Sequence, residues 1–500
     1  MLARRLAGFL GDRRGNVAII FGIAFIPIVV AGGSGVDLAR AFIVQQRLGH
    51  ALDAAALAVG TSLEKTDAQL EALAQSFFDA NYPAQELGVP GALAMAINDN
   101  VITMSASADV DTAFMRIVGY NEMSVSASSE VTRKLTGLEV VLVLDNTGSM
   151  SSNGKITALK SASTELVNIL FGDQTNPDYL KIGLVPFAAA VNVGTQYLNS
   201  GWIDTTGASS YNGLNFSEGR HALQVYDMLT NKSWNGCVEA RKMPMDVEDT
   251  TPNADDDPDT LWVPYFAPDE PDLWSWPNYY YNSYLDDNAS SDDSPQERQE
   301  KYSKYDNKSV SGDGPHYNCK TQPITPLTND KQDVLDAIDA MNATGNTNIS
   351  FGMAWGWRVV SPTVPFTEGT AYDDKKFRKA IILLTDGDNV IGQTSNHNKS
   401  TYNAYGYVKD ARLGTTSAWT ADAKLDERTS TVCTNIKNAN PDRPITVYTI
   451  TFQVSGDATK TLMRNCATDP EKYFDSPSNA ELTANFKIIA GELSELRISK

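Results

Sequence analysis

The chain has 500 residues, 42% hydrophobic and 20% charged, which is typical of a globular protein too long for one ordinary core. Its formal net charge is −20 at pH 7. This acidity argues against nucleic acid as a partner, because binding to phosphates requires clustered Lys and Arg. Divalent cations and basic partners remain compatible with it.

Residues 15–36 contain no charged side chain and are long enough to cross a membrane. At about 1.5 Å per residue they cover roughly 33 Å, and a hydrocarbon core is about 30 Å thick. A cleaved signal peptide is the alternative, but the apolar run is long and lacks a clear A-x-A cleavage site. Four arginines precede the run: Arg4, Arg5, Arg13 and Arg14. The positive-inside tendency therefore predicts a single-pass membrane protein, with residues 1–14 cytoplasmic and the bulk of the chain extracytoplasmic.

Residues 37–135 change from a helical to a strand pattern. Apolar residues from Leu38 to Val59 recur every three or four positions, so the membrane helix is expected to continue outward, and a second helix follows near Leu70–Phe78. Alternation of apolar and polar residues over 92–132 predicts strands. This order fits a pilin-like plan, in which a small sheet backs a helix, and equally fits a simple stalk.

Residues 138–500 alternate between strands and helices. The apolar run VVLVLD, residues 140–145, is typical of a central parallel strand covered on both faces. Further strands are expected at 181–187, 379–384 and 445–452, and helices at 155–171, 331–341, 430–439 and 480–496. The alternation predicts an α/β domain with a doubly wound, mostly parallel sheet.

Residues 196–320 interrupt this alternation. We expect them to lie outside the alternating sheet and to form a large irregular insertion at one edge of it. The segment is acidic and rich in Trp, Tyr and Pro, and its aromatic density argues against wholesale disorder. We expect 286–313 to be loosely held. The acidic run 255–257 with Asp259 could bind calcium, but it lacks the Gly and final Glu of an EF-hand loop, so a solvated loop is the simpler interpretation.

The four cysteines all follow the apolar run, and none lies in a C-x-x-C pair or at zinc spacing to a histidine. Outside the cytoplasm, disulfides are the expected state. Three pairings are possible. We favour Cys237–Cys319 with Cys433–Cys466, because each bond then closes one segment without crossing domain elements.

Side-chain oxygens follow the central strand directly. Asp145, Thr147 and Ser149 alternate in DNTGSM, so a tight loop could turn all three inward. Thr347 precedes a helix in a turn rich in Gly and Asn, and Asp386 follows another apolar strand. Ligands bind at the carboxyl ends of strands in such sheets, and hard oxygen donors suit Mg²⁺. For the first three residues, a helix N-cap is nearly as good an explanation.

Together these elements resemble the metal-ion-dependent adhesion site of the von Willebrand factor type A (vWA) domain, which reads D-x-S-x-S, then Thr, then Asp. The resemblance covers 138–500 and implies these metal ligands, direct or through water: Asp145, Thr147, Ser149, Thr347 and Asp386. Thr147 replaces the usual Ser and keeps the hydroxyl. The resemblance also implies bound Mg²⁺, or Mn²⁺ or Ca²⁺, and a partner protein whose Asp or Glu completes the coordination. A vWA fold with an empty site is the alternative.

The N-terminal part, with the run GNVAIIFGIAFIPIVVAGGSGVDLARAF and then LGHALDAAALA, resembles Tad-like (tight adherence) Flp pilus-assembly proteins. With motifs such as WNGCVEAR, PITPLT and LLTDGDN, nearly the whole chain resembles the TadG-like members. This resemblance implies a single-pass protein of the bacterial inner (cell) membrane with the bulk of the chain periplasmic, and residues 37–135 as a TadG-like helical stalk and small sheet. It also implies a role in assembling or anchoring a pilus, with other Tad components as partners. Prepilin processing usually requires Glu five residues beyond the cleaved Gly, but Ile20 stands there, so this cleavage is not expected.

We therefore expect a membrane-anchored binding protein that acts in pilus assembly, anchoring or adhesion. A pseudopilin-like structural subunit, whose vWA site is not metal-dependent, is the alternative. We do not expect an enzyme, because Ser149 has no histidine nearby in the sequence and none of the four histidines lies in a recognisable catalytic motif.

Overall fold

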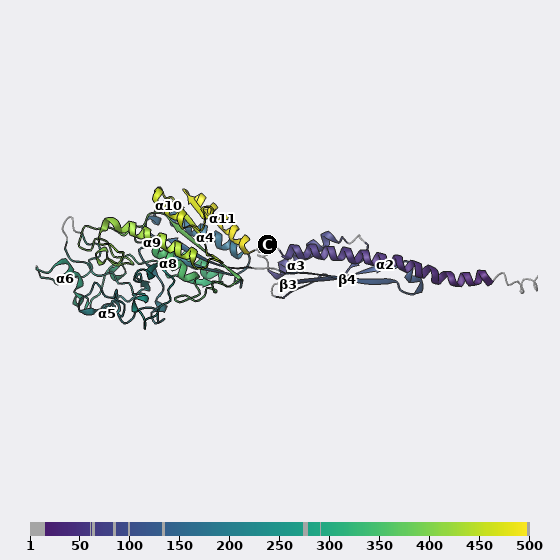
Figure 1. Cartoon of the computed structure of the whole chain (residues 1–500), viewed down its shortest axis with the longest axis horizontal. Helices are drawn as coiled ribbons and strands as arrows, with labels where there is room; N and C mark the ends of the chain where they lie inside the picture. Colours follow the sequence, from purple (N-terminus) through teal and green to yellow (C-terminus); the bar gives the residue numbers. More distant parts are fainter. Residues whose placement is uncertain are drawn as a thin grey trace, which may run out of the picture. The chain divides into compact units, whose positions relative to one another are not determined.

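The computed structural model describes residues 16–497, except for 61, 63–65, 84–86, 99–100, 133–135, 274–278 and 291. The chain divides into two compact units, Met1–Leu135 and Thr136–Ser499 (Figure 1). The predicted cytoplasmic segment, residues 1–14, lies outside the described residues.

The first unit begins with a long helix, α2 (Asn16–Gly60). In the uncharged part of α2, large apolar side chains are exposed: Ile20, Ile23 and Ile28 are 65%, 70% and 64% exposed. None of the other described elements of the unit covers them. By length and composition, α2 is the one helix in the described part of the chain that could cross a membrane. The candidate membrane span predicted from the sequence is therefore present.

Beyond the apolar run, one face of α2 becomes the core of a small helix-and-sheet unit. Val44, Leu48, Leu52 and Val59 are fully buried, against α3 and an antiparallel sheet. The elements are α3 (Asp67–Asn81), β1 (Val89–Pro90), β2 (Ala94–Asn98), β3 (Val101–Asp111) and β4 (Glu122–Thr132). Strand β3 pairs with β1, β2 and β4, and its alternate residues face the core, which explains the period of two in the sequence.

The second unit is built on one mostly parallel sheet, in the order β12-β11-β10-β5-β6-β7-β8. Its strands are β5 (Gly137–Asp145), β6 (Leu180–Phe187), β7 (Val191–Asn192), β8 (Cys237–Val238), β9 (Thr325–Thr328), β10 (Phe377–Thr385), β11 (Thr446–Phe452) and β12 (Tyr473–Ser476). The strands from β12 to β6 pair in parallel, whereas β7, β8 and β9 are antiparallel. The prediction of a mixed α/β unit with a mostly parallel sheet is confirmed.

Helices bury both faces of this sheet. Val141 and Val143 of β5 pack with α8 (Ile349–Val360), α9 (Ala418–Asn438) and α10 (Asp457–Cys466). Leu142 and Leu144 pack instead with α4 (Lys155–Phe171), α7 (Lys331–Asp339) and α11 (Asn479–Arg497). Because successive residues of a strand point to opposite faces, the unbroken apolar run of β5 serves both cores.

Helix α9 differs from its prediction because it begins at Ala418 rather than near 430. Its first half is rich in Asp, Lys and Thr and buries only Ala421, Leu425 and Thr429, so its apolar stripe is too narrow to stand out in the sequence. Helix α10 and strand β12 were not predicted at all.

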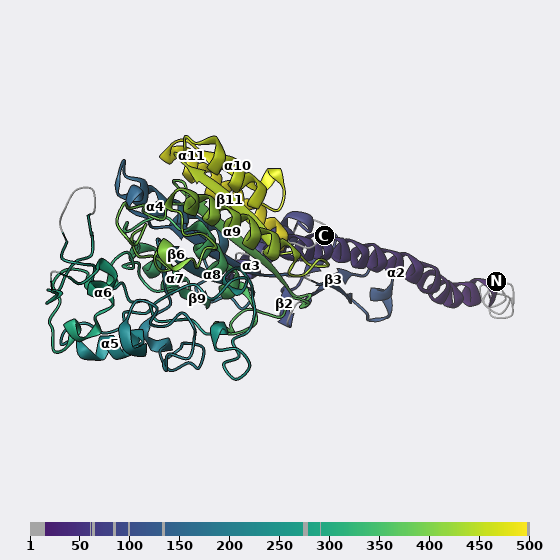
Figure 2. The same cartoon turned by 60° about the vertical axis from the view of Figure 1, so that its left-hand side comes forward.

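The insertion is mostly irregular chain with two short helices, α5 (Ala222–Met228) and α6 (Pro295–Glu300), visible in teal in Figure 2. Two expectations about it were wrong. Strand β8 lies within it and extends the sheet beside β7, so the insertion is not wholly outside the sheet. The described part of 286–313 is also held by buried charges at Asp287 and Lys304: the Lys304 ammonium lies 2.8 Å from Asp269 and 3.2 Å from Asp287.

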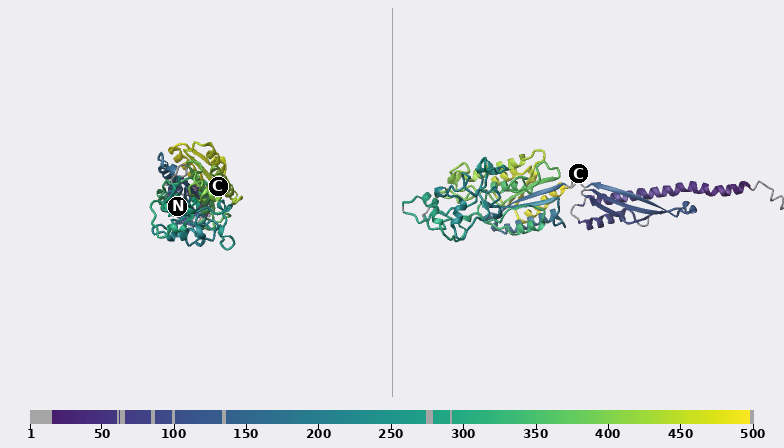
Figure 3. Two further views of the ribbon diagram at one scale, coloured as in Figure 1. Left: turned by 90° about the vertical axis from the view of Figure 1, so that its left-hand side faces the viewer. Right: turned by 90° about the horizontal axis from the view of Figure 1, so that it is seen from below.

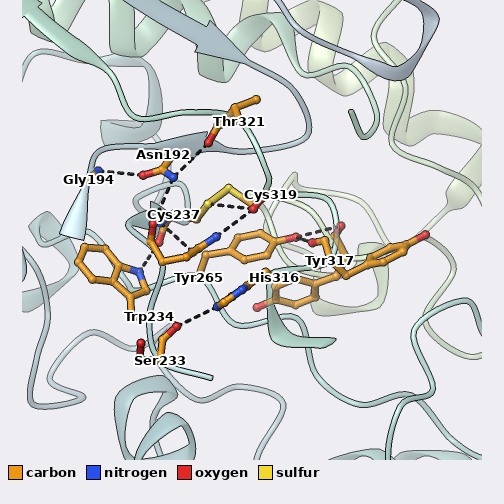
Figure 4. The surroundings of a disulfide bond; sticks show 12 residues. Asn192, Gly194, Ser233, Trp234, Cys237, Tyr265, His316, Tyr317, Cys319 and Thr321 are labelled. Atoms are coloured by element: carbon orange, nitrogen blue, oxygen red, sulfur yellow. Dashed lines mark hydrogen bonds between the residues drawn. A yellow bond between two sulfur atoms is a disulfide. The ribbon is translucent and has the colours of Figure 1, made fainter. Parts of the chain in front are cut away.

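Both disulfides have the favoured pairing. Cys237–Cys319 closes the insertion, and the Trp234 indole N–H donates to the Cys237 carbonyl at 2.6 Å beside it (Figure 4). Cys433–Cys466 joins α9 to the end of α10.

Opening the second disulfide should destabilise the α/β unit. The bond closes a loop with a sequence separation of 33, and the loop-entropy relation gives a loss of about 3–4 kcal/mol in the free energy of unfolding for Cys433→Ser with Cys466→Ser. Urea unfolding followed by circular dichroism measures this. The single variant Cys433→Ser serves as a control and should lose about as much. An unchanged midpoint in both would contradict the expectation.

Candidate functional site

Asp145 is the last residue of β5 and lies at the carboxyl end of the central strand. It is fully buried. One carboxylate oxygen, Oδ1, accepts the N–H of Thr147 at 2.8 Å, and the other, Oδ2, accepts the hydroxyl of Thr385 at 2.8 Å. Hydrogen bonds to both oxygens fix the orientation of the carboxylate at the start of the DNTGSM loop.

Strand β10 brings a second carboxylate to the same place. It pairs in parallel with β5, with Leu384 opposite Leu144, so the residues that follow the two strands meet at one edge. Asp386 Oδ1 accepts the hydroxyl of Ser149 at 2.6 Å, and the Ser149 and Thr147 hydroxyl oxygens are 3.0 Å apart. Four of the five predicted ligands therefore form one hydrogen-bonded cluster.

Thr347, the fifth predicted residue, reaches this edge through its backbone. The loop before α8 is tied to the DNTGSM loop by the Gly148 N–H, which donates to the Gly345 carbonyl at 2.9 Å. The Thr347 carbonyl accepts the N–H of Val390 at 2.9 Å, just beyond Asp386. Thr347 is buried, and within the described residues its hydroxyl makes no hydrogen bond to the other four.

Lys155 adds a positive charge to the cluster. Its ammonium lies 2.8 Å from Asp386 Oδ2, and both side chains are almost entirely buried. Lys155 is the first residue of α4, where a positive charge opposes the helix dipole. The attraction to Asp386 accounts for a lysine at this unfavourable position.

The sequence analysis missed Lys155 and Thr385. A signal for Lys155 was present, because a lysine at the start of the predicted helix 155–171 is unfavourable for the helix. Thr385 carried no such signal. It sits at the end of an apolar strand, and its role depends on a hydrogen bond across 240 positions of sequence.

The burial of the site and the charge of Asp386 perturb the titration of Asp145. Burial, and then the negative charge of Asp386, raise the pKa of Asp145 to about 6. A carboxyl whose pKa rises on folding favours the fold at low pH, and that contribution is lost as the pH rises from about 4 through about 6. At neutral pH the cluster therefore holds excess negative charge that a cation would relieve.

The donor set fits a hard divalent cation. Two carboxylates and the hydroxyls of Thr147 and Ser149 gather where Ser149 is exposed to solvent, and Mg²⁺ favours one or two carboxylates together with waters. No group of three or more His, Cys, Asp or Glu residues suited to a metal occurs in the part of the chain that the structure describes. A site here would therefore depend on hydroxyl and water ligands as well.

The acidic cluster of the insertion is divided between exposed and buried carboxylates. Residues 255–257 are exposed, but Asp259 is buried and lies 2.8 Å from the Lys242 ammonium. Asp259 also accepts hydrogen bonds from Ser209 and Ser210. The expected solvated loop was therefore wrong for Asp259, which links two parts of the insertion.

Comparison with known proteins found one family model that matches the region of the first helix. Residues 15–62 match the model of the family described as Tad, putative Flp pilus-assembly TadE/G-like. This match covers α2 and little more of the chain. A search of curated proteins found no match.

Among solved structures, pilus proteins show weak similarity. The pilus adhesin SpaC from Lactobacillus rhamnosus GG is 12% identical with a TM-score of 0.32, and the match covers 83% of this chain and 37% of SpaC. The vWF domain of the type V pili tip protein Mfa5 from Porphyromonas gingivalis is 11% identical with a TM-score of 0.33, covering 73% of this chain and 97% of that domain. The pilus adhesin RrgA from Streptococcus pneumoniae is 11% identical with a TM-score of 0.36, covering 81% and 49%. Similarity at this level does not define the function of this chain.

Replacing Lys155 by Met should alter both stability and cation binding. Without metal, loss of the buried partner of Asp386 should lower the free energy of unfolding by on the order of 3 kcal/mol. Affinity for Mg²⁺ should rise several-fold, because the ammonium no longer competes for the carboxylate. Urea unfolding and isothermal titration calorimetry measure the two effects. Lys160→Met on the same helix is the control, since Lys160 binds only the main-chain oxygen of Asp339. Equal behaviour of the two variants would contradict the role given to Lys155.

Proposed function

We propose that this chain is a membrane-anchored protein of a Tad/Flp pilus-assembly system that binds a partner protein through a divalent cation. The cluster of Asp145, Thr147, Ser149 and Asp386 carries this proposal. Its oxygens come from loops far apart in sequence, and they gather at the strand ends where ligands bind in sheets of this kind.

In this proposal the α/β unit is a vWA-type binding unit. The order of its parts supports the assignment: a D-x-T-x-S loop after the central strand, a threonine before a buried helix, and an aspartate after the neighbouring strand. The mostly parallel sheet with helices on both faces agrees with it.

The residues of the cluster would have different roles in binding the cation. Asp145 and Asp386 would supply negative charge to Mg²⁺, or to Mn²⁺ or Ca²⁺. Thr147, Ser149 and Thr347 would contribute oxygen directly or through water. When bound, the cation supplies a positive charge at the surface, and an Asp or Glu of the partner protein would meet it there. Lys155 offsets the charge of Asp386 when no cation is bound.

The pilus context is supported by the N-terminal family match, and the membrane anchor by α2. On this basis we place the α/β unit outside the inner membrane, where it would serve assembly, anchoring or adhesion of the pilus. The two disulfides fit an oxidising compartment. The partner would then be another component of the same envelope assembly, such as a second Tad protein.

A pull-down from solubilised cell envelopes tests this function. Residues 136–500 serve as bait with Mg²⁺ or with chelator, beside the variants Asp145→Ala and Asp255→Ala. We expect one partner that is retained by the wild type and by Asp255→Ala with Mg²⁺, and lost with chelator or in Asp145→Ala. The amount of partner retained should fall more than tenfold, because one bond from a carboxylate to a cation contributes more than about 1.4 kcal/mol to binding.

Circular dichroism must show that Asp145→Ala is folded. The same partners in all lanes would contradict metal-dependent binding, and would favour a pseudopilin-like subunit that acts through its N-terminal helix.

A further inference from the structure

The β3–β4 hairpin of the first unit runs along α2 toward the uncharged run of residues 15–36 (Figure 3). Three contacts trace this path. The Ser129 hydroxyl donates to Asp53 at 2.6 Å, and the Gln45 amide donates to the Ser126 carbonyl at 3.1 Å. The hairpin then reaches Asp37 at its turn. The turn of the hairpin therefore lies at the level of α2 where the uncharged run ends.

Two residues of α2, Asp37 and Gly33, hold the turn at this level. The buried Asp37 carboxylate accepts the N–H groups of Ala113, Phe114 and Met115, each at 2.8 Å. One helical turn earlier, Phe114 packs so closely on Gly33 that a Cβ there would lie 2.1 Å from the ring. Because three hydrogen bonds and one close contact act together, the turn has a fixed place on the helix.

The outward side of this turn is apolar. It contains a single 3₁₀ turn, Met115–Val118, and Ile117, Val118 and Tyr120 are 55%, 53% and 63% exposed. Arg116 is the one charged residue between Thr112 and Asn121 in the sequence. Soluble surfaces rarely leave neighbouring large apolar side chains uncovered without a binding role. Aliphatic residues with one Tyr and one Arg are the composition found at a membrane–water interface.

We propose that residues 115–120 form a second contact with the lipid bilayer, beside the membrane span. A span needs about 20 residues, so one that begins at Val17 ends near Val36, next to Asp37. The turn fixed to Gly33 and Asp37 then meets the outer edge of the hydrocarbon core. Ile117 and Val118 insert among the lipids, Tyr120 lies among the headgroups, and Arg116 reaches phosphate oxygens.

This contact would restrain the first unit at the membrane. A single helix can tilt and rotate in a bilayer, whereas a second insertion point beside it limits both motions. The inference depends on the membrane anchoring proposed above. It does not depend on the cation site.

Spin labels on the full chain in vesicles of phosphatidylcholine and phosphatidylglycerol test this proposal. All four native cysteines are in disulfides, so one introduced cysteine gives one free thiol. Labels are placed by Val118→Cys at the turn, Ile23→Cys in the span, and Leu57→Cys, an exposed leucine far up the same helix. Electron paramagnetic resonance then compares collisions with oxygen, which concentrates in lipid, with collisions with a water-soluble nickel chelate.

We expect the ratio of oxygen to nickel accessibility at position 118 to exceed that at position 57 several-fold and to approach that at position 23. A water-exposed label at 118 with a lipid-exposed label at 23 would overturn this inference and leave the anchor intact. Water exposure at 23 would overturn both. A label at 118 shielded from both reagents would show that protein, such as a second copy of the chain, covers the turn, and would also overturn the proposal.

Discussion

The parallel pairing of β5 with β10 is the constraint on which the candidate site depends. It brings the ends of two buried strands side by side. Strand β5 ends in Asp145, and Asp386 directly follows β10. Two carboxylates thus meet at one sheet edge, although like charges repel and burial disfavours both. Two neighbouring groups stabilise the carboxylates: the Thr385 hydroxyl donates a hydrogen bond to Asp145, and the Lys155 ammonium forms an ion pair with Asp386.

This arrangement lowers the stability of the fold. A buried aspartate whose pKa is raised to about 6 destabilises the fold at neutral pH, and a lysine at a helix start is locally unfavourable. Sites that break local rules in this way are where function is expected. Ser149 at the exposed end gives the site access to solvent.

Local patterns in the sequence were enough to predict much of this structure. The run VVLVLD indicated a strand buried on both faces, and the oxygen-rich loops after two such strands indicated that Asp145 and Asp386 would meet. What could not be predicted rests on contacts between distant residues. Lys155 pairs with a residue 231 positions away, and Lys304 holds the insertion through charges buried among aromatic rings. A sequence pattern indicates which residues are buried and, from the period of the apolar residues, whether they form a helix or a strand. It does not indicate which distant charges will be paired.

Anomalous X-ray diffraction from crystals of residues 136–500 grown with Mn²⁺ tests the central claim most directly. We expect a manganese peak bounded by oxygens of Asp145, Ser149 and Asp386, with the Lys155 ammonium displaced from Asp386. No peak at this edge, with Lys155 still paired to Asp386 at saturating Mn²⁺, would contradict it. The cluster would then be a structural feature of the fold, with Lys155 as the counter-ion of Asp386.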